Sequence, residues 1–255
     1  MGAEIGAVHL RVRDLAHITD FYTNVMGARA APLDGNTTAL HPEGSDDPLF
    51  VLHGDPAARP ARGTTGLFHA AVLLPTRADL ATWLHHALTT GWRLQGASDH
   101  AVSEAIYLAD PAGNGLEVYR DRPRAEWPMR GDQVAMVTDP LDLDDLLAAA
   151  AGQWVGWPPG TRIGHVHLRV NDIAQAADFY GALGFAVMAR YGQQAVFLGA
   201  DGYHHHIGAN TWGTAGAPPP PPDAAGLMHI EIRMPDAAAQ ERTDPAGLRV
   251  RIGSG

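Results

Sequence analysis

Histidines at repeated positions are the side chains of this sequence best suited to bind a metal ion or carry a proton. The 255 residues contain 14 histidines and no cysteine, which excludes disulfides, thiolate catalysis and cysteine zinc sites. Any metal site must therefore combine imidazoles with carboxylates. Four histidines stand at matching places in repeated segments, His9 with His167 and His69 with His229.

The repeat itself determines which elements must position these side chains. Residues 5–22 read IGAVHLRVRDLAHITDFY, and residues 163–180 read IGHVHLRVNDIAQAADFY. Two shorter echoes follow in the same order, GLFH with GLMH and DPAG with DPAG, beginning at residues 66, 226, 110 and 244. One supersecondary unit has therefore been used more than once.

The first unit has a mixed α and β pattern. Residues 8–13 alternate apolar and polar side chains, which predicts a strand. Apolar residues at helical spacing over 16–26 predict a helix, with Asp14 at its start and Gly27 as its C-cap. Three short strands follow, over residues 29–32, 37–40 and 49–53. The unit therefore reads βαβββ.

Residues 66–120 repeat this order of elements. We predict a strand, a helix and three strands, over residues 67–74, 77–90, 94–98, 105–108 and 115–119. Two such units make a first domain over 4–121, and a second domain covers 161–253. A connector rich in Pro and Trp joins them over 122–160. The predicted fold class is α+β, with paired βαβββ modules in two tandem domains.

The last module is short. Thirty-five positions separate Pro75 from Asp110, but nine separate Pro235 from Asp244, a difference of 26 that equals about one helix and one strand. A half-sheet without its helix would expose a large apolar face. We therefore expect an omission from the sequence rather than a true deletion.

Charge and hydropathy exclude several classes of partner. The net charge of −10 argues against nucleic acid, because phosphates require a basic surface. No run approaches the ~18 apolar residues of a membrane span, and the N-terminal residues do not resemble a secretory signal. We expect a cytoplasmic protein without a membrane or nucleic-acid partner.

The two pairs of modules, each opening with a V-H-L-x-V-x-D-[LI] strand and an F-Y helix, resemble the vicinal oxygen chelate superfamily. That superfamily includes glyoxalases, bleomycin-resistance proteins and type I extradiol dioxygenases. Residues 99–119, DHAVSEAIYLADPAGNGLEVY, resemble the last two strands of an extradiol active-site domain. Residues 203–208, YHHHIG, are similar to the same catechol-2,3-dioxygenase-like, two-domain branch. The resemblance implies two tandem vicinal-oxygen-chelate domains.

By this resemblance the metal ligands are His9 in VHLRV, His69 in LFHAA and Glu117 in GLEVY. Two imidazoles and one carboxylate on one face of a non-haem iron leave open positions for substrate and dioxygen. The resemblance places the three residues on strands that line the inside of one cupped sheet. We expect Fe(II) as the cofactor, with Mn(II) as the alternative.

The second domain offers a rival set of ligands. It keeps His167 and His229 but has Arg251 where the carboxylate should be, and a cation repels a divalent ion. Glu231 could replace the missing carboxylate, or His206 could complete a set with His167 and His229. Typical large extradiol enzymes hold iron in the second domain, so the choice of domain stays open.

Two further residues are implied as catalytic. His100 matches a histidine that the family places before the last strands, and imidazole exchanges protons near neutral pH. Tyr107 matches a hydrogen-bonding tyrosine of the same motif. The family also has a histidine before the second ligand, but residues near Asp47 offer none, and His53 comes some residues late.

These features predict a metal-dependent extradiol ring-cleaving dioxygenase, which acts on a catechol-like aromatic diol with O2 as the second substrate. One alternative is a glyoxalase-type metal-dependent isomerase or lyase, in which Glu117 or a nearby base moves a proton. Another is a metal-free small-molecule binding or resistance protein, which the missing acid–base histidine would fit. Exposed sheet edges are compatible with a homodimer.

Overall fold

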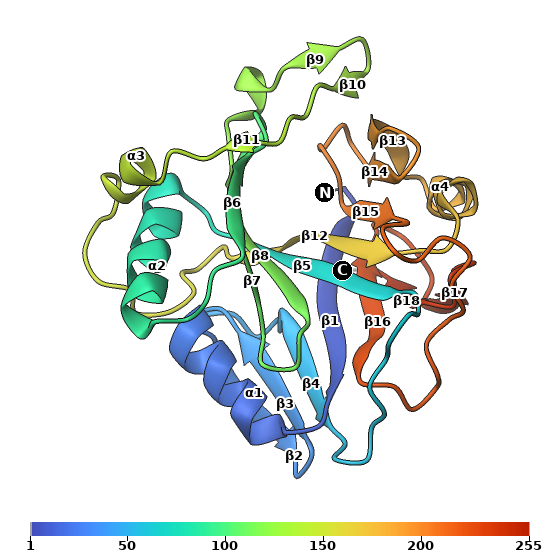
Figure 1. Cartoon of the computed structure of the whole chain (residues 1–255), viewed down its shortest axis with the longest axis horizontal. Helices are drawn as coiled ribbons and strands as arrows, with labels where there is room; N and C mark the ends of the chain where they lie inside the picture. Colours follow the sequence, from blue (N-terminus) through green and yellow to red (C-terminus); the bar gives the residue numbers. More distant parts are fainter. Residues whose placement is uncertain (1, 255) are drawn as a thin grey trace.

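The computed structural model describes residues 2–254, whose strands and helices follow the repeat (Figure 1). Module one contains β1 (Glu4–Val12), α1 (Leu15–Phe21), β2 (Arg29–Asp34), β3 (Thr37–His41) and β4 (Phe50–Gly54). Module two contains β5 (Gly66–Leu73), α2 (Arg77–Thr90), β6 (Gly96–Asp99), β7 (Ser103–Ala109) and β8 (Gly115–Asp121). Both modules have the predicted βαβββ order.

The second half of the chain begins with a connector that extends along one side of the molecule. The connector contains a 3₁₀ turn (Arg124–Glu126), β9 (Met129–Arg130), β10 (Gln133–Val134), β11 (Asp139–Pro140) and α3 (Leu143–Leu147). Module three contains β12 (Arg162–Arg169), α4 (Ile173–Ala182), β13 (Ala186–Tyr191), β14 (Ala195–Gly199) and β15 (Ile207–Asn210). Module four consists of β16 (Gly226–Arg233), β17 (Gln240–Thr243) and β18 (Arg249–Gly253).

The helices begin and end at the residues that local chemistry favours. The Asp14 side chain accepts a hydrogen bond from the backbone N–H of His17 at 3.0 Å, which satisfies an otherwise unpaired donor. α1 continues as a π-helical turn (Tyr22–Met26) and ends at Gly27, whose φ of 87° lies in the left-handed region. Within residues 2–254, no helix is both long and apolar enough to span a bilayer.

Two large sheets organise the molecule, and each combines two modules. A seven-stranded sheet has the order β17-β18-β16-β1-β4-β3-β2, so it joins modules one and four. A nine-stranded sheet has the order β11-β6-β7-β8-β5-β12-β15-β14-β13, so it joins modules two and three. This pairing differs from the expectation that modules one and two would share a sheet.

The same cross-strand contact occurs at the centre of both sheets. β1 runs antiparallel to β16 with His9 opposite His229, and β5 runs antiparallel to β12 with His69 opposite His167. Because side chains alternate along a strand, the histidines share one face of each sheet. The apolar residues between them face the common core.

Module four lacks a helix, and the chain continues without a break from β16 to β18. Whether a stretch is omitted from module four stays a prediction. Its apolar residues Ile230, Ile232 and Val250 are buried in the same core cluster as Val166 and Leu168 of β12. β1 packs against β12, and β16 against β5, so the nine-stranded sheet covers the face that a helix would otherwise cover.

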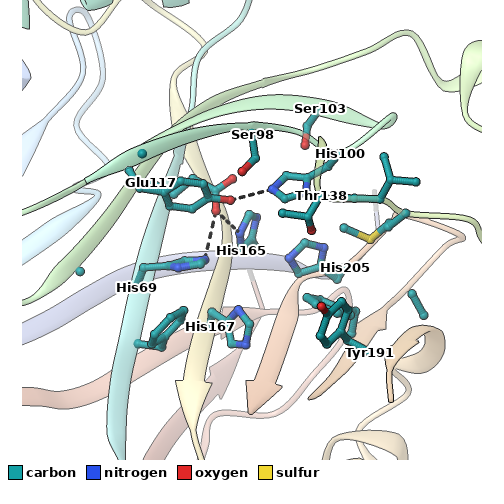
Figure 2. A pocket seen from close by; sticks show the side chains of 18 of the residues that line it. His69, Ser98, His100, Ser103, Glu117, Thr138, His165, His167, Tyr191 and His205 are labelled. Carbon is teal, nitrogen blue, oxygen red and sulfur yellow. Dashed lines mark hydrogen bonds and ion pairs between the residues drawn. The ribbon is translucent and has the colours of Figure 1, made fainter. Parts of the chain in front are cut away.

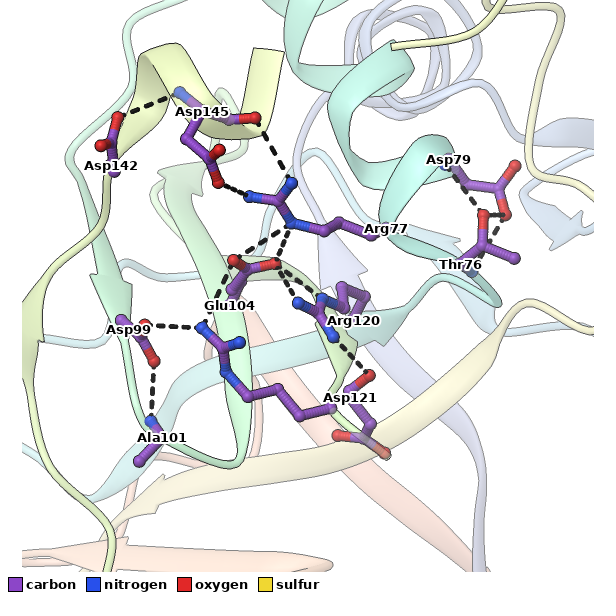
Figure 3. A network of polar contacts seen from close by, with 11 residues as sticks. Thr76, Arg77, Asp79, Asp99, Ala101, Glu104, Arg120, Asp121, Asp142 and Asp145 are labelled. Atoms are coloured by element: carbon purple, nitrogen blue, oxygen red, sulfur yellow. Dashed lines mark hydrogen bonds and ion pairs between the residues drawn. The ribbon is translucent and has the colours of Figure 1, made fainter. Parts of the chain in front are cut away.

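A buried carboxylate joins helix α2 of module two to its strands through ion pairs (Figure 3). Glu104 on β7 lies 2.9 Å from Arg77 Nε on α2 and 2.6 Å from Arg120 Nε on β8. Arg122 joins them with an Nη2 contact of 3.4 Å. Arg77 also holds Asp145 of α3 at 2.6 Å, so this network ties the connector to the strands that carry the site described next.

Candidate metal centre

Three neighbouring strands of the nine-stranded sheet bring two imidazoles and a carboxylate together (Figure 2). Glu117 Oε2 on β8 lies 3.1 Å from His69 Nε2 on β5 and 3.3 Å from His165 Nε2 on β12. One ligand atom from each residue lies within 4.8 Å of the other two. All three side chains are buried, which makes them a candidate site for one divalent ion.

The strand register explains why these side chains meet. Ala71 on the central strand β5 lies opposite Glu117 on one side and His165 on the other. His69 lies two residues earlier on β5, so it points to the same face as Ala71. The small side chain of Ala71 leaves the space between the three ligands free.

The chemistry of the three residues fits a divalent ion. Burial lowers the pKa of His165 to about 4, so its imidazole is neutral at physiological pH. Burial also opposes a charge on Glu117, but His165 and His69 hold its pKa well below the ordinary value. His69 Nε2 is buried, and its 3.1 Å contact with Glu117 Oε2 lacks the geometry of a hydrogen bond. Imidazole nitrogens and an ionised carboxylate are the kinds of ligand that metal binding requires.

These residues open into a cavity of about 900 Å³. Its lining includes the aromatic side chains of Phe68 on β5, Phe197 on β14 and Trp212 in the turn after β15. His100 and Tyr107, the residues expected to be catalytic, line the same cavity. A cavity of this size, with both aromatic and polar side chains in its wall, is large enough for a small molecule.

His100 and Tyr107 form a hydrogen-bonded pair whose direction the structure fixes. His100 Nδ1 lies 2.7 Å from the carbonyl oxygen of Val137, which can only accept. The proton of neutral His100 is therefore on Nδ1, and Nε2 accepts from the Tyr107 hydroxyl at 2.7 Å. Burial, followed by the charge of Glu117, raises the pKa of Tyr107 well above its ordinary value. The tyrosine thus stays protonated and orients His100.

Sequence reasoning missed His205, which lines the cavity from module three. Its ring centroid lies 4.0 Å from that of His165. In the repeat, His205 of module three occupies the position of Asp47 in module one, where the family histidine was expected. Module three, and not module one, shares the sheet with module two. The YHHHIG segment was the signal that could have found it.

A chain of hydrogen bonds sets the tautomer of His205. Asp121 Oδ1 accepts from His204 Nε2 at 2.9 Å, and an imidazole with its one proton on Nε2 has an acceptor at Nδ1. That nitrogen lies 2.7 Å from His205 Nδ1, so His205 donates there. The unprotonated atom of neutral His205 is then Nε2. Burial holds the pKa of His205 well below its ordinary value, so this ring is neutral.

A sequence model of the Glyoxalase/Bleomycin resistance protein/Dioxygenase superfamily matches residues 4–118 and 162–255. The chain belongs to this superfamily. The resemblance read from the V-H-L strands and the DPAGNGLEVY segment is therefore confirmed. The α+β fold class of repeated modules, which the superfamily shares, is confirmed as well.

Two kinds of relative place the chain within the superfamily. A catechol-2,3-dioxygenase of Bacillus subtilis (strain 168) is 40% identical over 253 residues, or 97% of this chain and 87% of that protein. The structure of a candidate dioxygenase from Bacillus subtilis has a TM-score of 0.65 at 14% identity, covering 98% of this chain and 84% of that one. Glyoxalase I from Zea mays has a TM-score of 0.60 at 14% identity, covering 99% and 92%. The chain is a dioxygenase-like enzyme of this superfamily.

His9, expected as a ligand beside His69 and Glu117, lies in the other sheet. Its Nδ1 is 3.0 Å from His53 Nε2, and its Nε2 is 3.2 Å from Glu231 Oε1. The structure therefore does not bring the expected set of three together. The reason is the pairing of module two with module three, which places β12 and not β1 beside β5.

The alternative set of His167, His229 and His206 is not brought together either. His167 lines the cavity, His229 lies on β16 in the other sheet, and His206 Nδ1 accepts from the backbone N–H of Ala200 at 3.2 Å. His165 was overlooked because the sequence repeat aligns His9 with His167, two residues later.

Proposed function

We propose that the chain is a metal-dependent extradiol dioxygenase that cleaves the ring of a catechol-like diol. The observation that carries the proposal is the buried group of His69, Glu117 and His165, which opens into a cavity with aromatic walls. These residues would hold Fe(II), or alternatively Mn(II). When bound, such an ion supplies the Lewis acidity and redox chemistry that dioxygen addition to a chelated diol requires.

The residues around the proposed ion account for orientation and proton transfer. Phe68 and Phe197 give the diol ring apolar surfaces and exclude water from that part of the cavity. His205 Nε2 accepts the proton of a diol hydroxyl, and the Asp121–His204 pair holds the ring in the tautomer that leaves this atom unprotonated. The His100–Tyr107 pair holds a second proton at the cavity wall. Acid–base groups of this kind typically contribute about 10²–10⁴-fold to rate.

Oxygen consumption tests the proposal directly. Protein loaded with Fe(II) under anaerobic conditions is mixed with oxygen and a panel of catechols, and oxygen uptake and the yellow absorbance of ring-fission product are recorded. We expect uptake of O2 with wild-type protein and with His85→Gln, a change at an exposed histidine on α2. Glu117→Gln should abolish the uptake of O2.

Two results would contradict the proposal and identify the alternatives. Isomerisation of a substrate without oxygen, with Ni(II), Co(II) or Zn(II) in the site, would favour the glyoxalase-type reaction. Tight binding of an aromatic molecule by protein that holds no metal at His69, Glu117 and His165 would favour a binding or resistance protein.

The charge of the cavity favours an anionic substituent on the substrate. Arg130, Arg169 and Arg190 line the cavity and are exposed, and none forms an ion pair with another described residue. Arg169 also stacks on Phe68, with 5.1 Å between its Cζ and the ring centroid. We infer that the substrate is a catechol with a carboxylate or a similar anionic group.

A comparison of charged and neutral catechols tests this inference. We expect KM for a carboxylated catechol to be about 10-fold below that of its uncharged analogue, as one charge contact near a surface provides. Arg190→Gln should reduce the difference in KM between the two catechols, and added salt should also reduce it. Equal KM values for both substrates at low salt would contradict the inference.

A further inference from the structure

We propose a second divalent-metal site on the seven-stranded sheet, built by His9 of module one with His229 and Glu231 of module four. This site uses none of the residues of the candidate centre, and it does not depend on the proposed dioxygenase activity. An ion bound there would crosslink the two modules that are farthest apart in the sequence.

The two central strands of this sheet bring the ligand atoms together. His9 on β1 lies opposite His229 on β16, and their rings stack with 3.9 Å between centroids. Glu231 lies two residues beyond His229 on the same face of β16, and its Oε1 is 3.2 Å from His9 Nε2. Ligand atoms of all three residues lie within 4.8 Å of one another.

His229 is the observation that points to a ligand. Its side chain belongs to a residue only 3% exposed, and neither Nδ1 nor Nε2 has a hydrogen-bond partner among the described residues. A neutral imidazole has one donor and one acceptor, and leaving both unpaired in the interior is unfavourable. A metal ion near His9 and Glu231 would satisfy the lone pair of one His229 nitrogen.

The remaining polar atoms of the site are already held in place. His9 Nδ1 lies 3.0 Å from His53 Nε2, and Glu231 Oε2 accepts from the backbone N–H of Ala7 at 3.3 Å. When His9 donates its Nδ1 proton to His53, its Nε2 lone pair faces Glu231 Oε1, and a cation between them satisfies both. Metal-ligating histidines commonly hold their other nitrogen in a hydrogen bond of this kind.

The nearby arginines are engaged elsewhere but reduce the expected affinity. Arg251 on β18 lies beside Glu231 on β16, and the Arg251 Nε donates to Glu241 at 2.8 Å. Arg249 Nε donates to the Met228 carbonyl at 3.2 Å. Both cations remain close enough to oppose a divalent ion, so we expect weaker binding here than beside Glu117.

The donor set and the exposure suit Zn(II). Two imidazole nitrogens and one carboxylate oxygen are zinc ligands, and a water completes the tetrahedron. The Glu231 side chain is 34% exposed, so an ion and its water can enter from solvent. We assign the site a structural role, because His9, His229 and Glu231 do not line the cavity of about 900 Å³ that holds the candidate centre.

Zinc stoichiometry tests the proposal in full-length protein without an affinity tag. Calorimetry and elemental analysis are applied to wild type, to a cavity variant (His69→Gln with Glu117→Gln), and to the same variant carrying His229→Gln. We expect about two, one and zero equivalents of Zn(II), and we expect zinc to raise the melting temperature of the cavity variant. Adding His85→Gln instead of His229→Gln should leave one equivalent bound.

Several outcomes would overturn the second site. A folded cavity variant that binds no zinc would do so, as would an equivalent of zinc that survives His229→Gln. If His229→Gln prevents folding, Glu231→Gln replaces it, because this half-exposed residue can change without opening the core. If wild-type protein shows no oxygenase activity but still binds the second equivalent of zinc, the proposed function is rejected and this site is retained.

Discussion

His165 and His167 lie two residues apart on β12 and line the same cavity, but their surroundings differ. His165 lies 3.3 Å from Glu117, whereas His167 packs against Phe68 and Trp212. The sequence repeat pairs His167 with His9, whereas the position of His165 is occupied by Ala7 in module one. A repeated residue therefore indicated the shared fold, and the candidate ligand lies where the two copies differ.

Substitution of these two histidines should separate their roles. His165→Ala removes one of three proposed ligands, so iron binding should weaken by more than the ~10–100-fold typical of residues that only orient a ligand. His167→Ala should weaken it by less than about 10-fold. Fe(II) content after dialysis against a chelator series measures both variants. Equal loss in the two would contradict the assignment of His165.

At the scale of elements, local chemistry made most of the structure predictable. The predicted helix over 77–90 coincides with α2, and the predicted strand over 67–74 differs from β5 by one residue at each end. The family resemblance also placed His69 and Glu117 on strands that line one face of a sheet. It could not identify which strand lies beside β5, because β1 and β12 have nearly the same sequence and the same pattern of faces.

The Glu104 network should contribute strongly to stability. Glu104→Gln leaves Arg120, which is 9% exposed, without its carboxylate, and loss of one partner from a buried ion pair typically costs about 3–5 kcal/mol. Asp145→Asn changes the exposed end of the same network and should cost less than about 1 kcal/mol. Urea unfolding measures both, and equal destabilisation would show that the buried carboxylate has no special role.

At the scale of the molecule, one pair of modules is nested inside the other. Modules two and three form the sheet that holds the candidate centre, while modules one and four form the sheet that packs against it. This arrangement explains how module four can lack a helix, and why the cavity gathers histidines from both halves of the chain. This pairing of modules could not be predicted from the sequence, because it depends on contacts across the whole core.

Buried histidines should make the molecule sensitive to acid. Burial lowers the pKa of His206 from the ordinary 6.5 to about 4, so the unfolded chain binds its proton first. The contribution of neutral His206 to the free energy of unfolding is therefore complete above pH 6.5, and it declines as the pH falls towards 4. His206→Gln should reduce the slope of unfolding free energy in this range by up to about 1.4 kcal/mol per pH unit.

Urea unfolding at several pH values checks this expectation. His85→Gln, at an exposed position, is the matched control and should keep the wild-type slope. An unchanged slope in His206→Gln would show that other groups govern the acid response.

The place of β1 between β4 and β16 has a consequence for synthesis on the ribosome. His9 contacts a glutamate 222 residues further along the chain, so one edge of β1 has no partner until nearly everything else has been translated. At about 5–20 residues per second this delay exceeds roughly ten seconds. During that time an open strand edge is available to neighbouring chains. Nascent-chain aggregation should therefore depend on how fast the codons for residues 226–233 are read, even though none of them encodes a residue of the cavity.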